Sequence, residues 1–180
     1  MKLLRTIRLD VSDTFVFEKA AEPGEWAVSG AFVFWDRDPS ALEGKARSAF
    51  RGGFLGVASL GWSTLVQIVE ASEDDRLAVI DTLAKQLVAN FGAPTVADAC
   101  AAAEEEVAFA ESLCSQPRDT LVAVHRTSED DGLHEAFRTL RPRNGPKPLR
   151  AFSFLEVEGE DDAQPIESVD LIGMAERDRK

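Results

Sequence analysis

Cysteine is scarce in this 180-residue sequence, which has only Cys100 and Cys114. The alanine-rich segment between them predicts a single helix, which would hold the two thiols about 21 Å apart. A disulfide cannot span that distance. We therefore expect two free thiols, buried as small apolar side chains, in a protein of a reducing compartment.

Long apolar runs are also missing. No stretch approaches the roughly 20 apolar residues that a membrane-spanning helix needs. Arg5 and Arg8 interrupt the start of the chain, where a secretory signal would require an unbroken apolar segment. The sequence therefore predicts a cytoplasmic protein without a membrane partner.

Histidine is equally scarce, with His125 and His134 as the only two. Four acids lie close to them in the sequence and make a metal site conceivable: Glu129, Asp130, Asp131 and Glu135. A recognised metal-binding spacing is absent, and acidic surface loops are common, so we predict no metal and no cofactor. Two histidines also offer few candidates for a catalytic base, and we predict no catalytic residues.

Acidic side chains outnumber basic ones by 32 to 20, and the net charge of −12 disfavours binding to nucleic acid. One basic island stands out against this background. It comprises five cations between residues 137 and 150, without an acid among them: Arg138, Arg141, Arg143, Lys147 and Arg150. The island either pairs with acids of the same chain or recognises an acidic surface of a protein partner or an anionic ligand.

The composition, 44% hydrophobic and 29% charged, is that of a globular protein with one sizeable core. Apolar segments predict strands at 2–9, 31–35, 63–71, 119–127 and 149–159. Cap residues and apolar stripes predict helices at 39–50, 73–91 and 95–115, and a short one within 128–142.

These elements predict a single α+β domain over residues 1–158. Its sheet is expected to be mostly antiparallel, with five or six strands, and the two long helices are expected to pack on one face. Residues 159–180 are expected to form an acidic linker and a C-terminal docking segment.

The stretch GGFLGVASLGWSTLVQIV, residues 52–69, is the strongest candidate for a site. Gly56 and Gly61 have the spacing of a phosphate-binding loop, but Trp62 stands where that loop needs lysine. Ser63 lacks both the second glycine and the following helix of a nucleophile turn. A bend before a buried strand explains the stretch best. The alternative is a small-ligand pocket lined by Arg51, Ser59, Trp62 and Ser63.

Three stretches make the chain resemble a family of small acidic proteobacterial proteins of unknown function: KLLRTIRLDVSDTFVFEKAAEPGEWAVSGAFVFWD, GGFLGVASLGWSTLVQIVE and EAFRTLRPR. The resemblance covers most of the chain and implies no activity, catalytic residue or cofactor.

Two functions are compatible with these observations. The leading one is a non-enzymatic binding or accessory protein, which recognises a protein partner or a second copy of itself through the basic island, the C-terminal apolar segment or both. The alternative is a small-molecule-binding domain, with or without catalysis, whose pocket lies at the glycine-rich turn around Trp62 and Ser63.

Overall fold

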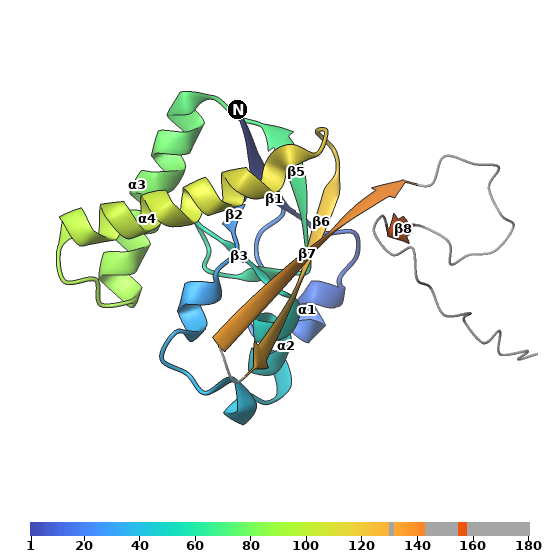
Figure 1. The fold of residues 1–180 in the computed structure, drawn as a ribbon, viewed down its shortest axis with the longest axis horizontal. Coiled ribbons are helices and arrows are strands. Elements are labelled where there is room, and N and C mark those ends of the chain that lie inside the picture. Colours follow the sequence, from blue (N-terminus) through green and yellow to red (C-terminus); the bar gives the residue numbers. More distant parts are fainter. Residues whose placement is uncertain (130–131, 143–154, 158–180) are drawn as a thin grey trace, which may run out of the picture.

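The computed structural model describes residues 1–129, 132–142 and 155–157, and its centre is one twisted antiparallel sheet (Figure 1). The strands are β1 (Lys2–Ile7), β2 (Trp26–Val28), β3 (Phe54–Gly56), β4 (Trp62–Ser63), β5 (Leu65–Glu70), β6 (Leu121–Glu129), β7 (Gly132–Pro142) and β8 (Leu155–Val157). Hydrogen bonds join them in the order β4-β3-β2-β1-β5-β6-β7-β8, and every neighbouring pair is antiparallel.

The helices are α1 (Ser12–Val16), α2 (Gly44–Gly52), α3 (Glu73–Asn90) and α4 (Val96–Ser112), with short 3-10 helices η1 (Ala31–Phe34), η2 (Pro39–Ala41) and η3 (Leu113–Ser115). The predicted α+β class, antiparallel sheet and two long helices are confirmed. The sheet has eight strands rather than five or six. Strands β2, β3 and β4 have only two or three residues each, too few to show an alternating pattern in the sequence.

Local capping signals determine where the two long helices begin. At the start of α3, the Ser72 hydroxyl accepts a hydrogen bond from the Asp75 backbone N–H (3.1 Å), and the Asp75 carboxylate accepts one from the Ser72 N–H (2.9 Å). At the start of α4, the Thr95 hydroxyl accepts from the Asp98 N–H in the same way. The predicted bounds therefore agree with the observed ones to within a few residues.

The main core lies between α4 and one face of the sheet. Helix α4 contacts β1 and β2, and α3 packs against α4. The residues that α4 buries are small: Ala99, Ala103, Val107 and Ala110. On the sheet, Leu4, Ile68 and Val122 are almost completely buried. Small side chains on α4 let the helix approach the sheet closely.

The central strand predicted at 31–35 is wrong. After β2, Gly30 adopts a φ of +78° and turns the chain out of the sheet, and the next four residues form η1. The run of apolar residues that suggested a buried strand instead packs against the core from a helical turn. The ring of Phe34 lies 5.3 Å from the rings of Phe50 and Trp62.

The short helix predicted within 128–142 is also wrong, because most of this segment forms strand β7. It pairs with β6 along nine residue pairs, from Leu121 opposite Leu140 to Glu129 opposite Gly132. Glu135 and Phe137 are half-buried, whereas the residues between and beside them are exposed, which is the two-residue period of a strand. Hydrogen bonds to β6 outweigh the helical spacing of the apolar residues.

Within the described ranges, no helix is long and apolar enough to cross a membrane. The predicted C-terminal segment 159–180 lies outside these ranges. Of the predicted last strand, 149–159, the described part is β8.

The two cysteines are free, but only Cys114 is buried, because Cys100 lies on the exposed side of α4. Burial raises the pKa of the Cys114 thiol to about 11. At pH 8 we therefore expect a thiol reagent to label one cysteine of the folded protein rapidly and the second only on unfolding. Cys100→Ser is expected to abolish the rapid phase. Rapid labelling of two thiols would contradict this expectation.

Candidate functional site

The glycine-rich stretch forms a hairpin turn that binds a carboxylate of the same chain. Strand β3 ends at Gly56, and β4 begins at Trp62. In the turn between them, the Glu25 carboxylate accepts hydrogen bonds from the N–H groups of Ala58 (3.0 Å) and Ser59 (2.8 Å) and from the Ser59 hydroxyl. A Cβ on Gly56 would come within 2.5 Å of this carboxylate. The turn therefore binds an anion, but Glu25 already supplies it.

The structure does not bring together the four residues predicted to line a pocket here. Ser59 is bonded within the turn, and Trp62 packs in the core with 9% of its surface exposed. Ser63 is buried, and its hydroxyl donates to the carbonyl oxygens of Ile7 (3.2 Å) and Leu65 (2.7 Å). Arg51 alone among the four lines the pocket described next.

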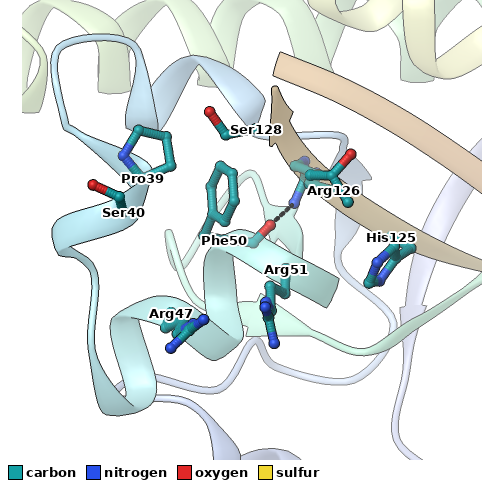
Figure 2. A pocket seen from close by; sticks show the side chains of 9 residues that line it. Pro39, Ser40, Arg47, Phe50, Arg51, His125, Arg126 and Ser128 are labelled. Atoms are coloured by element: carbon teal, nitrogen blue, oxygen red, sulfur yellow. Dashed lines mark hydrogen bonds between the residues drawn. The ribbon is translucent and has the colours of Figure 1, made fainter. Parts of the chain in front are cut away.

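A pocket of about 270 Å³ lies where α2 packs against β6 (Figure 2). Arg47 and Arg51 extend from α2, where residues four positions apart share one face. His125 extends from β6. The remaining lining residues are Pro39, Ser40, Phe50, Arg126, Thr127 and Ser128. We call this site the basic pocket.

The described side chains that line the basic pocket give it positive charge. Among the described residues, its lining includes no aspartate or glutamate, and the acid bonded to a lining residue is Asp38, which accepts a hydrogen bond from the Ser40 hydroxyl. Arg47 and Arg51 are exposed, and neither has an acid within 4 Å in the part of the chain that the structure describes. In a protein with a net charge of −12, this local excess of cations favours an anionic ligand.

Arg126 is fully buried, and its hydrogen bonds join the two elements that form the basic pocket. Its Nη1 donates to the carbonyl oxygens of Phe50 (3.1 Å) and Gly53 (2.7 Å) at the end of α2. Its Nη2 donates to the carbonyl and hydroxyl oxygens of Ser29, and its Nε donates to the Glu135 carboxylate at 2.6 Å. Burial lowers the pKa of Arg126, and the contact with Glu135 opposes that effect. Arg126 thus joins α2 to the sheet and positions the arginines of α2.

Glu106 of α4 is a second acid near this ion pair. Burial raises the pKa of Glu106 to about 7, the charge of Glu135 adds to the rise, and Arg126 opposes it. The Oε2 atom of Glu106 is buried and has no hydrogen-bond partner among the described residues. Near neutral pH a substantial fraction of Glu106 is therefore protonated.

Two other candidate sites were considered in the sequence, the metal site and the basic island. Across the described residues, no group of three or more histidine, cysteine, aspartate and glutamate side chains could hold a metal ion. In the basic island, Arg138 is exposed on β7. The description does not extend to the other side chains of the island: Arg141, Arg143, Lys147 and Arg150.

Sequence reasoning identified Arg51 but missed Arg47 and His125 as residues of one pocket. The four-residue spacing of the two arginines was a usable signal, although the helix predicted at 39–50 ended one residue before Arg51 and the observed α2 includes it. The position of His125 was not accessible in the same way, because only the packing of α2 against β6 brings it to the arginines.

Fold and site together define an α+β protein with a basic pocket between a helix and the sheet. The model of a family of unknown function, DUF6505, matches residues 1–154, and the chain belongs to this family. The family membership expected from the resemblance is thereby confirmed. No curated protein and no solved structure shows a significant match to the chain.

Proposed function

We propose that the protein binds a small molecule through a phosphate group in the basic pocket. The observation that carries this proposal is the convergence of Arg47, Arg51 and His125 on one pocket, whose lining holds no acidic side chain among the residues that the structure describes. The proposal keeps the small-molecule alternative from the sequence but places the ligand beside α2 rather than at the turn around Trp62 and Ser63.

The donors of the basic pocket suit a phosphate group better than a carboxylate. Arginine guanidinium groups bind either anion through paired hydrogen bonds. The pocket adds the exposed hydroxyl groups of Thr127 and Ser128, whereas the Ser40 hydroxyl already donates to the Asp38 carboxylate (2.7 Å). A phosphate monoester has three free oxygens for these donors, whereas a carboxylate has two. Because Arg126 fixes the end of α2, the backbone that carries Arg47 and Arg51 is in place before a ligand binds.

Calorimetric titration with inorganic phosphate tests the proposal, and acetate serves as the carboxylate arm. We expect phosphate to bind more tightly than acetate and to bind more weakly as sodium chloride is raised. The double variant Arg47→Gln/Arg51→Gln should lose at least about tenfold in affinity, because charge-assisted hydrogen bonds are removed. Both side chains are exposed, so the variant should fold.

Arg118→Gln provides the matched control. It also removes an exposed arginine, but Arg118 lies outside the lining of the basic pocket. We expect it to leave phosphate binding unchanged. Equal weakening in both variants would attribute binding to net charge alone and would overturn the proposal, as would the absence of phosphate binding to the unmodified protein.

Recognition of a protein partner through the basic island stays a separate prediction. Its support is the exposure of Arg138 on β7 together with the run of cations that follows it in the sequence. Arg138, the cation of the island whose side chain the structure describes, is not part of the lining of the basic pocket.

A further inference from the structure

A larger, mainly apolar hollow of about 590 Å³ adjoins the basic pocket. Its apolar lining consists of Ala31, Phe32, Phe34, Trp35, Phe50 and Leu133, with Pro39 at the border. Hollows of roughly 300–1,000 Å³ are the usual size for binding small molecules. We call this second site the apolar hollow.

The basic pocket and the apolar hollow share part of their walls. Pro39, Phe50 and Ser128 line both. Figure 2 shows the ring of Phe50 near Pro39 and Ser128, above the arginines of α2. A ligand anchored at Arg47 and Arg51 can therefore extend past Phe50 into the apolar hollow.

The rim of the apolar hollow leaves large apolar side chains in solvent. Trp35 is 90% exposed, and Leu133 is 42% exposed. When an apolar group of a ligand covers such side chains, apolar surface leaves water and the free energy of binding becomes more favourable. Glu106 also lines the hollow, and its buried Oε2 has no hydrogen-bond partner among the described residues and can pair with a polar group of a ligand.

We infer that the ligand is an amphiphilic phosphate, whose phosphate group lies against Arg47 and Arg51 and whose apolar chain or ring fills the hollow between Trp35 and Leu133. This inference rests on the proposed function and extends it, because it assigns a chemical class to the part of the ligand that the basic pocket does not hold. Charge at one end and apolar surface at the other match the two adjoining sites.

A series of ligands that differ only in chain length tests the inference. The 180-residue protein is titrated with inorganic phosphate and with butyl, hexyl and octyl phosphate, all below the concentrations at which they form micelles. We expect affinity to rise roughly tenfold for each two methylene groups added. The fluorescence of Trp35 should shift to shorter wavelength when octyl phosphate binds, and Trp35→Phe should remove that shift.

Variants of the rim separate the two parts of the ligand. Leu133→Ser and Trp35→Ser change exposed side chains, so both proteins should fold. We expect each to bind octyl phosphate about tenfold more weakly and inorganic phosphate as the unmodified protein does. Leu77→Ser is the matched control, because Leu77 is 54% exposed on α3 and does not line the apolar hollow. It should alter neither affinity.

The outcomes distinguish this inference from the proposed function. The inference of an amphiphilic ligand is overturned if affinity does not depend on chain length. It is also overturned if Leu77→Ser lowers the affinity for octyl phosphate as much as Leu133→Ser does. In both cases the proposed binding of phosphate stands. If inorganic phosphate and all three alkyl phosphates fail to bind, both the proposed function and this inference are overturned.

Discussion

Replacing Arg126 by methionine is expected to lower the free energy of unfolding by about 3–5 kcal/mol. Methionine occupies much of the same volume but supplies no donor. The Glu135 carboxylate, whose side chain is 16% exposed, would lose its cationic partner. The carbonyl oxygens of Phe50, Gly53 and Ser29 would also lose their hydrogen bonds from the guanidinium group. Urea denaturation measures the loss, and the melting temperature should fall by roughly 10 °C.

Three further variants locate the origin of this loss. Arg138→Met removes an exposed arginine of β7 and should cost less than about 0.5 kcal/mol. Arg126→Lys keeps the charge but lacks the planar fork, so its loss should be intermediate. Adding Glu135→Leu to Arg126→Met removes the unpaired carboxylate and should recover part of the stability, but not the part due to the carbonyl oxygens. A loss below about 1 kcal/mol for Arg126→Met would show that Arg126 does not hold α2 to the sheet.

Glu106 is expected to make the protein less stable as pH rises from about 4.5 to about 7. Its pKa is about 7 in the folded state, against an ordinary value of 4.5 for a glutamate carboxyl. In this window the folded protein keeps the proton that the unfolded chain releases, so the free energy of unfolding falls with pH. The stability that protonated Glu106 contributes is fully present below the pKa of the unfolded chain. It is lost as pH rises through the pKa of the folded protein. It amounts to a few kcal/mol, at about 1.4 kcal/mol per pKa unit.

The charged groups that set this behaviour come from three elements. Burial is the largest cause of the raised pKa, and the charges of Glu135 on β7 and Glu105 on α4 add to it. Arg126 on β6 acts in the opposite direction. Arg37, which also lines the apolar hollow, is exposed.

Glu106→Gln tests the pH dependence, because the amide resembles the protonated carboxyl and does not titrate. In urea denaturation, the free energy of unfolding of the variant minus that of the unmodified protein should be larger at pH 8 than at pH 5. Glu104→Gln removes an acid from an exposed position of α4 and should change stability equally at the two pH values. A carbon-13 titration of Glu106 should show a midpoint near 7. The same stability difference for Glu106→Gln at both pH values would contradict the assignment.

The elements that sequence reasoning predicted well carry their signals within a few residues. The capping box at Ser72 and Asp75 and the Thr95 cap begin α3 and α4 wherever the rest of the chain lies. The pattern of small buried residues on α4 likewise depends only on helical spacing. These features are local, and so the sequence alone was enough to predict them.

The errors arose where a distant partner decides the structure. Residues 31–34 are all apolar, which suits a strand and a 3-10 helix equally, and the choice is made at Gly30, which adopts a positive φ where its backbone packs against Leu55 and Trp62. Along β7, apolar residues at helical spacing were overruled by the long pairing with β6. Neither outcome can be derived from the segment itself.

By itself, the sequence determined the α+β composition of the protein, its two long helices, its acidic charge and its two separated thiols. Tertiary structure alone decided that Arg47 and Arg51 meet His125, that Arg126 is buried against the end of α2, and that Glu106 lies near Glu135. The physical reason is the range of the interactions. Helix caps and side-chain periodicity act within one or two turns of the chain, whereas a pocket and a shifted pKa depend on the packing of segments that are far apart in the sequence.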